Sequence, residues 1–345
     1  MMVLWAHLSG YWLYENGRSW IVQDLWSQYV VVPFHLYQNA GHLGVILFFL
    51  ISGYIITHTS LRETWRQFLT KRALRVFPLL FVALALSLVA IRVNTAMNLG
   101  PLPGLQSHSA IAHASAFFLV DHFLGIEYTL GPTWTLAIEI TFYALVGVAV
   151  ALTRTPPMRA TWAMIAGWVI VSPIILGTPE LGHLKPIIVY IPFLFLGRIA
   201  YLWQHRLAEA WSSATAIAST LVLFLLFYTA AFPGQLLIPQ VEPIVTYAIA
   251  LVAFTTLLFC PLSRVPRPLR ILGDLSYSIY LLHIPVGMIV INLCIAGGAP
   301  FTVAFLTATV ATLAVSYVTY KTVEIPGQRL ARRISARMRP HAELR

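Results

Sequence analysis

Long apolar runs, separated by short polar or Pro/Gly-rich breaks, dominate this chain. A helix needs about 20 predominantly apolar residues to cross a bilayer. Runs of this kind predict ten membrane spans, near residues 1–14, 43–60, 74–93, 133–153, 162–177, 186–204, 214–232, 242–260, 272–295 and 301–323. The pattern therefore predicts an all-α fold, a polytopic membrane helix bundle of about ten transmembrane helices in one domain over residues 1–326.

Two segments fit the pattern less well. Residues 108–126 are apolar but interrupted by His113, Asp121 and His122, which predicts an interfacial or re-entrant segment, with an eleventh span as the alternative. The first run is short and has no basic residue ahead of it, so we expect the natural first helix to begin upstream. A secretory signal peptide is the alternative, although a basic leading region and a small-residue cleavage site are lacking.

Composition points to the same class of protein. The chain is 59% hydrophobic and 10% charged, with a mean hydropathy of +0.78, whereas soluble domains are about 25% charged. A net charge of +10 is compatible with nucleic-acid binding, but the basic residues are scattered between apolar runs, so we expect no nucleic-acid partner. Cys260 and Cys294 lie in apolar runs, which predicts packing roles and neither a disulfide framework nor a thiol metal site.

The distribution of basic residues predicts the topology, because cytoplasmic loops collect Lys and Arg. With ten spans and the N-terminus inside, nineteen basic residues face the cytoplasm and three, Arg18, Arg92 and Lys185, face outward. This bias predicts that both termini are cytoplasmic and disfavours an eleventh span. Residues 327–345 form a basic cytoplasmic tail, which we expect to be a helix lying on the membrane surface.

Glu139 is the one acidic residue placed well inside a predicted span. A charge at the centre of a membrane helix costs roughly 2.5 to 3.5 kcal/mol on insertion scales, so such a residue indicates function. Thr135 and Tyr143, four residues away on either side, share its helix face. The alternative is an acid that a neighbouring hydroxyl holds in order to fix helix packing.

His7 is the corresponding polar residue of the first run, with Tyr11 and Tyr14 on the same helical stripe. At about 1.5 Å per residue, His7 lies about 10 Å and Glu139 about 9 Å below the outer surface. A carboxylate that orients an imidazole makes a general base for a hydroxyl proton. The pattern therefore predicts a catalytic pair, His7 and Glu139, whereas an isolated buried histidine is more often a satisfied core residue.

The ninth span carries a polar stripe of Ser276, Tyr280, His283 and Gly287. We expect this stripe either to face a substrate cavity or to form a hydrogen-bonded helix seam closed by the glycine. On the inner side, Arg72 and Arg75 share one helix face beside Lys71 and Arg66, and arginines spaced in this way bind phosphate. Topology alone also explains basic residues at this boundary. Earlier in the chain, Ser52 and Gly53 permit close helix approach or the passage of a thin ligand.

Five segments in this order resemble the acyltransferase-3 family of integral membrane acyltransferases. They are the first-span His7, "FFLISGYIIT" at 48–57, the Arg72-x-x-Arg75 pair, "TWTLAIEITFY" at 133–143 and "LGDLSYSIYLLHIP" at 272–285. The resemblance covers nearly the whole chain. The chain departs from the family pattern at two positions. The family has an Arg eleven residues before the first-span His, and here that position lies ahead of residue 1. Thr135 replaces the usual Ser.

The resemblance implies an enzyme that transfers an acyl group, commonly acetyl from acetyl-CoA, to a hydroxyl of a carbohydrate or natural product at a bacterial-type cytoplasmic membrane. It places His7, Arg72, Arg75, Trp134 and Glu139 at functional positions and requires no metal. We expect His7 and Glu139 to be catalytic. The expected acyl-CoA contacts are Arg72, Arg75, Lys71, Ser52 and Gly53, and the expected substrate cavity includes Trp134, Tyr143, Ser276, Tyr280 and His283.

Several alternatives stay open at this point. The acceptor is a surface polysaccharide, a lipid-linked sugar or a macrolide-like product, and transfer proceeds directly or through an acyl-enzyme. A proton-coupled transporter with a relay of His7, Glu139 and His283 is the rival function. A scaffold without catalysis leaves the intramembrane glutamate unexplained.

Overall fold

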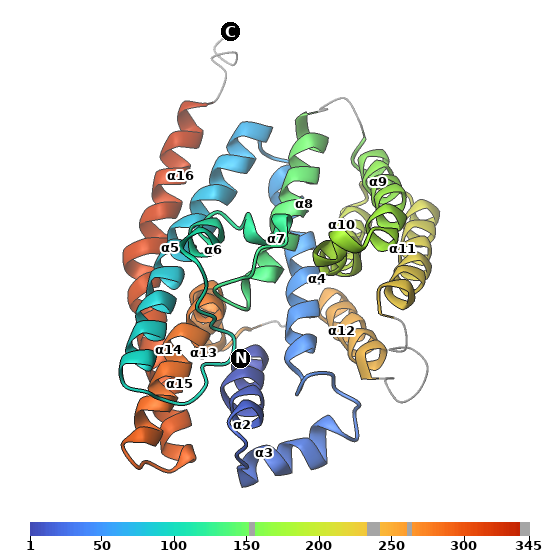
Figure 1. Cartoon of the computed structure of the whole chain (residues 1–345). Coiled ribbons are helices and arrows are strands. Elements are labelled where there is room, and N and C mark those ends of the chain that lie inside the picture. Colours follow the sequence, from blue (N-terminus) through green and yellow to red (C-terminus); the bar gives the residue numbers. More distant parts are fainter. Residues whose placement is uncertain (152–155, 233–241, 261–263, 339–345) are drawn as a thin grey trace. The chain divides into compact units, whose positions relative to one another are not determined.

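The computed structural model describes residues 1–151, 156–232, 242–260 and 264–338, and within these ranges the chain is predominantly helical (Figure 1). In chain order the elements are α1 (Met2–Trp5), η1 (Ala6–Tyr11), α2 (Trp12–Glu15), α3 (Ile21–Trp26), η2 (Ser27–Val31), α4 (Gly41–Ser60), α5 (Trp65–Ala96), α6 (Ala110–Ala116), α7 (Asp121–Leu124), α8 (Thr133–Ala151), α9 (Pro157–Gly177), η3 (Pro179–Leu184), α10 (Lys185–Gln204), α11 (Ala210–Ala231), α12 (Glu242–Phe259), α13 (Arg267–Asp274), α14 (Ser276–Ala296), α15 (Phe301–Thr319), η4 (Tyr320–Glu324) and α16 (Ile325–Arg337). The described residues form no β-strand beyond an isolated bridge between Leu105 and Leu130.

Nine helices in the described ranges are long and apolar enough to cross a membrane, which confirms the predicted polytopic helix bundle. They are Gly41–Ser60, Trp65–Ala96, Thr133–Ala151, Pro157–Gly177, Pro179–Gln204, Ala210–Ala231, Glu242–Phe259, Ser276–Ala296 and Phe301–Arg337. The first predicted span, near residues 1–14, is helical from Met2 to Glu15 through α1, η1 and α2, but it is shorter than such a helix. Some of the predictions fall outside the described residues. They concern residues 152–153 at the end of one predicted span, Arg154, Arg339 and Arg345 in the count of basic residues, and the tail from 339 onward.

Two helices extend beyond their predicted limits. Helix α5 begins at Trp65, so the basic residues expected at the entrance of a span lie within its first turns. At the other end of the chain, α15 continues through the π-helical turn η4 into α16. Pro326 lacks the amide hydrogen that an unbroken α-helix requires, and a wide turn directly before it accommodates that loss. The described part of the basic tail is thus a continuation of the last helix.

The segment 108–126 contains two short helices, α6 and α7, of 7 and 4 residues. The side-chain oxygen of Ser109 accepts a hydrogen bond from the amide of Ala112 and caps the first of them. Neither helix is long enough to cross a bilayer. The eleventh span is therefore absent from this described segment.

The chain divides into two compact units, each formed by three stretches. Unit 1 comprises Met1–Val45, Phe77–Thr133 and Val241–Pro326, and unit 2 comprises Ile46–Val76, Trp134–Gln240 and Gly327–Arg345. In unit 1, α14 packs along α15 and also against the first helix (Figure 1). Trp12 Nε1 donates a hydrogen bond of 2.8 Å to Asn292 Oδ1, and Gly287 faces the side chain of Leu8. These contacts fix the first helix beside α14.

In unit 2, α10 packs against α9 and α11 (Figure 1). It crosses α4 at two glycines. A Cβ atom on Gly53 would lie 2.1 Å from the carbonyl oxygen of Leu194, and one on Gly197 would lie 2.0 Å from the carbonyl oxygen of Leu50. Neither separation is possible between real atoms, so only glycine permits this backbone approach. Gly53 therefore serves close helix packing, one of the two roles that the sequence left open.

We expect Gly197→Ala to lower the melting temperature of the detergent-solubilised protein, because overpacking costs about 1–3 kcal/mol. The matched control is Gly167→Ala on α9, where an added Cβ meets nothing within 4 Å. That change should leave the melting temperature unchanged or raise it, since Ala favours a helix over Gly by roughly 0.5–1 kcal/mol. Equal melting temperatures for the two variants would contradict the proposed crossing.

Candidate active site

His7 lies on the π-helical turn η1, and its imidazole meets that of His283 on α14, 276 residues later in the sequence. His7 Nδ1 is 2.8 Å from His283 Nε2, and the two rings are nearly parallel, with an interplanar angle of 14°. His283 is buried, with 1% of its surface exposed, whereas His7 is half-buried. Two candidate residues that were predicted for separate roles thus form one pair within unit 1.

The other members of the α14 stripe have different surroundings. Ser276 is the first residue of α14 and is exposed, so it lies outside the buried part of the stripe. The hydroxyl of Tyr280 donates a hydrogen bond of 3.1 Å to the carbonyl of Pro132. A Cβ on Gly287 would approach the side chain of Leu8 to 2.6 Å. Gly287 therefore allows close packing of α14 against the first helix, and His283 makes a polar contact with His7.

Glu139 is the centre of a second cluster, in unit 2. Its carboxyl accepts hydrogen bonds from the side chains of Tyr143 and Ser52, and the charges of Arg75 and Arg72 act on it. The glutamate is 7% exposed and Tyr143 is 5% exposed. The cluster unites residues that the sequence assigned to catalysis, to donor binding and to the cavity.

The two arginines of the Arg72-x-x-Arg75 pair differ in exposure although they share a helix face. The Arg72 guanidinium lies 5.5 Å from the ring of Phe68 and 5.6 Å from the ring of Tyr143. It also donates to the hydroxyl of Thr59, while its Nε has no hydrogen-bond partner in the described residues. Arg75 is exposed. Arg72 is therefore held between aromatic rings, and Arg75 is the more accessible charge.

Two further candidates in unit 2, Lys71 and Trp134, are engaged by neighbouring side chains. Lys71 forms an ion pair with Glu63 at 2.7 Å, so its ammonium group already has a partner. Trp134 packs against Tyr190, with ring centroids 5.2 Å apart, and against Phe49 at 6.2 Å. Neither Tyr190 nor Phe49 was singled out from the sequence, because aromatic residues are common in membrane helices.

The predicted pairing of His7 with Glu139 joins residues of different units and stays a prediction. What the structure adds is a separate partner set for each: His283 for the imidazole, and Tyr143, Ser52 and two arginines for the carboxylate. The sequence indicated that each histidine needs a polar partner, but not which partner it finds. Two histidines in apolar helices each require a polar partner, and each satisfies the need of the other.

A further group of polar side chains precedes α8 in unit 1. Asp121 is fully buried, and neither carboxylate oxygen has a hydrogen-bond partner among the described residues. His122 Nε2 lies 3.9 Å from this carboxylate and 2.8 Å from the hydroxyl oxygen of Thr133. Burial raises the pKa of the Asp121 carboxyl and lowers the pKa of the His122 imidazole. Both groups are thereby shifted toward their uncharged forms.

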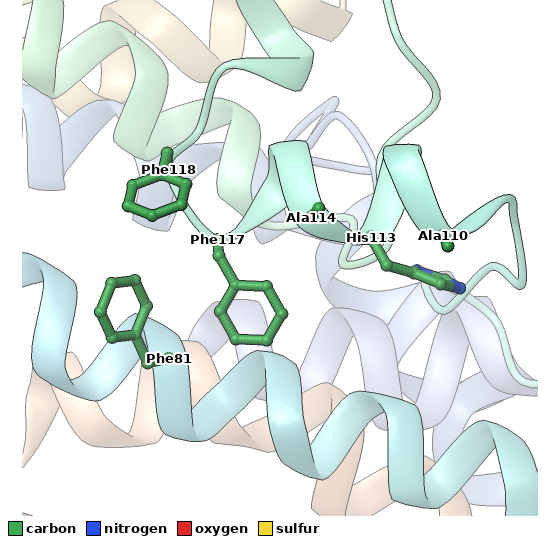
Figure 2. A pocket seen from close by; sticks show the side chains of 6 residues that line it. All are labelled: Phe81, Ala110, His113, Ala114, Phe117 and Phe118. Atoms are coloured by element: carbon green, nitrogen blue, oxygen red, sulfur yellow. The ribbon is translucent and has the colours of Figure 1, made fainter.

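An open groove of about 520 Å³ lies between α5 and α6 in unit 1 (Figure 2). Figure 2 shows the rings of Phe81, Phe117 and Phe118 on one side and His113 at the other end. None of the predicted site residues lines it, so the groove is separate from the two clusters. Within the described ranges, no group of three His, Cys, Asp or Glu side chains is arranged to hold a metal ion.

Comparison with known proteins identifies relatives over most of the chain. The acyltransferase-3 family, described as an acyltransferase domain, matches residues 1–321. Nodulation protein 10 of Rhizobium leguminosarum bv. viciae is 29% identical over 85% of this chain and 84% of its own length. An O-acetyl transferase of Shigella phage Sf6 is 27% identical over 84% of this chain and 85% of its own.

A longer relative is O-acetyltransferase OatA of Staphylococcus aureus, which is 27% identical over 86% of this chain and 54% of its own length. No solved structure matches the chain. The family match extends over both units and includes all of the segments that carried the resemblance. The chain therefore belongs to the acyltransferase-3 family of integral membrane acyltransferases and is a multi-pass membrane O-acyltransferase.

Proposed function

We propose that the protein transfers an acetyl group from cytoplasmic acetyl-CoA to a hydroxyl of an extracytoplasmic or membrane-associated carbohydrate. Two relatives are named O-acetyltransferases, which supports an acetyl group as the group transferred and an oxygen atom as its acceptor. The observation that carries the proposal is the half-buried imidazole of His7, which sits in an apolar helix and is held by His283 through one ring nitrogen. Such an imidazole retains a second nitrogen for a hydroxyl proton.

The proposed reaction is a direct transfer. As the acceptor oxygen attacks the thioester carbon, its proton passes to the second ring nitrogen of His7. The carbon–sulfur bond then breaks, and the departing thiolate takes that proton, so the products are free CoA and an ester. Glu139 is proposed to balance the transient positive charge of His7.

On the donor side, the exposed guanidinium of Arg75 is suited to the phosphates of CoA, because arginine binds phosphate through paired hydrogen bonds. Arg72 is proposed to support the same site and to hold Glu139, whose charge it already balances within unit 2. Lys71 is a peripheral contact, since Glu63 engages it. Ser52 is proposed to lie beside the pantetheine arm. Gly53 is instead packed against the backbone of α10 at Leu194.

The proposed orientation places both termini in the cytoplasm of a bacterial-type cell, with the acyl-CoA site on the inner side. The excess of Lys and Arg supports this orientation. A macrolide-like natural product is the alternative acceptor. Family membership favours acyl transfer over the proton-coupled transporter.

We expect His7→Gln to lower kcat for acetyl transfer by roughly 10²- to 10⁴-fold, the range for loss of a general base. The measurement is incorporation of radiolabel from acetyl-CoA into base-labile esters, in membrane vesicles from cells that make the protein. His58→Gln is the control, because His58 contacts the hydroxyl of Tyr201 in unit 2. Activity of His7→Gln at the level of this control would refute the proposed role of His7.

We expect the Arg72→Ala/Arg75→Ala double variant to bind a thioether analogue of acetyl-CoA about tenfold or more weakly, since hydrogen bonds to charged groups contribute about 1.5–3 kcal/mol. The matched control is Arg66→Ala, which removes a charge that stacks on Trp65 on the same helix. Binding is measured on the purified protein. Unchanged analogue binding together with lost activity would mean that the arginines serve Glu139 instead of the donor.

Direct transfer also predicts that purified protein incubated with radiolabelled acetyl-CoA, in the absence of acceptor, retains no covalent label after rapid quenching. Label that survives quenching would indicate an acyl-enzyme. His7→Gln then identifies the nucleophile, because label that persists in this variant is attached to another residue.

A further inference from the structure

We propose that His283 is a positioning residue that fixes the tautomer of His7, so that His7 presents an unprotonated Nε2 to the acceptor hydroxyl. The inference rests on the proposed function of His7 as the base. Two sets of hydrogen bonds support this assignment: those of His283 to backbone carbonyls, and the one between His283 and His7.

The first step is the proton on His283. Its Nδ1 lies 2.6 Å from the carbonyl oxygen of Tyr280 and 3.2 Å from that of Ile279. A carbonyl oxygen only accepts hydrogen bonds, so Nδ1 of His283 carries a hydrogen. In a neutral imidazole the other nitrogen is then an acceptor. Nε2 of His283 therefore presents a lone pair.

The second step is the proton on His7. Its Nδ1 lies 2.8 Å from Nε2 of His283, and a hydrogen bond between them requires one donor. Because His283 supplies the acceptor, His7 Nδ1 is the donor and carries the hydrogen of a neutral ring. The lone pair of His7 is then on Nε2, the nitrogen that points away from His283. This is the protonation state that a general base requires.

The neutral form of His283 follows from its surroundings. It is 1% exposed on an apolar helix, and its three hydrogen-bonding contacts are two carbonyls and an imidazole. A charged imidazolium buried there without a carboxylate partner is strongly disfavoured. A neutral acceptor thus orients the base without adding a charge to the helix interior. An aspartate in the same place would add one.

Packing keeps the two rings in register. Gly287, one turn after His283, lets α14 approach Leu8, the residue that follows His7. Trp12 Nε1 donates to Asn292 Oδ1 further along the same interface. These contacts hold the helices together independently of the two histidines, so the role of His283 can be tested apart from folding.

The experiment compares two substitutions of similar length at His283. His283→Met removes the acceptor, and we expect kcat for acetyl transfer to fall by about 10²-fold, with the KM for acetyl-CoA unchanged. His283→Gln places an amide oxygen where it accepts from His7 Nδ1, and we expect activity within about tenfold of the original protein. Trp12→Phe is the control, because it removes a hydrogen bond from the same helix interface without touching either ring.

A second readout is independent of catalysis. ¹⁵N chemical shifts of histidine-labelled protein distinguish protonated from unprotonated ring nitrogens, and the signals missing from His7→Gln identify His7. We expect His7 to carry its hydrogen on Nδ1 in the original protein and in His283→Gln, and to lose this preference in His283→Met. A hydrogen on Nε2 of His7 in the original protein would overturn the proposal.

The remaining outcomes separate the two claims. Full activity of His283→Met beside an inactive His7→Gln would reject the role of His283 and leave the proposed function standing. Full activity of His7→Gln would reject the proposed function itself, whatever the ¹⁵N shifts show. Equal losses in His283→Gln and His283→Met, or an equal loss in Trp12→Phe, would mean that His283 matters for packing and not for the proton on His7.

Discussion

Polar side chains inside apolar helices have to find their partners within the protein, because hydrocarbon offers no hydrogen bonds. This constraint governs the interior of both units. In unit 1 it joins His7 to His283, Trp12 to Asn292 and Ser278 to Glu324. Each of these bonds connects two helical elements, so satisfying the polar groups also determines which helices become neighbours.

The two clusters solve the same problem in different ways. The imidazoles are uncharged donors and acceptors that complete each other, whereas Glu139 has hydroxyl donors and two nearby cations. Each arrangement keeps the net charge of its surroundings small, which lowers the cost of placing it among apolar helices. The chain thereby holds an imidazole pair and a carboxylate cluster, each stabilised by partners within its own unit.

Hydropathy was sufficient to predict the spans and to single out His7 and Glu139 as exceptions within them. It was insufficient for their partners, because the depth of a residue in a membrane says nothing about which way its side chain faces around the helix axis. His283 is 276 residues from His7, and no local pattern connects them. The burial of Arg72 was missed for a related reason: α5 begins at Trp65, so Arg72 belongs to a packed helix with Phe68 and Tyr143 beside it.

The π-helical turn that carries His7 has a consequence for how the family can vary. A turn of this kind contains one residue more than an α-helical turn. The widened turn absorbs that extra residue, so the helical segments on either side keep the faces that they present to their neighbours. Deleting one residue between Ala6 and Tyr11 would therefore close the turn to regular α-helical winding and leave Trp12 on the face that meets α14. The change would fall on the side chains inside the turn itself, so length in this stretch alters what lines the turn without altering how the flanking segments pack.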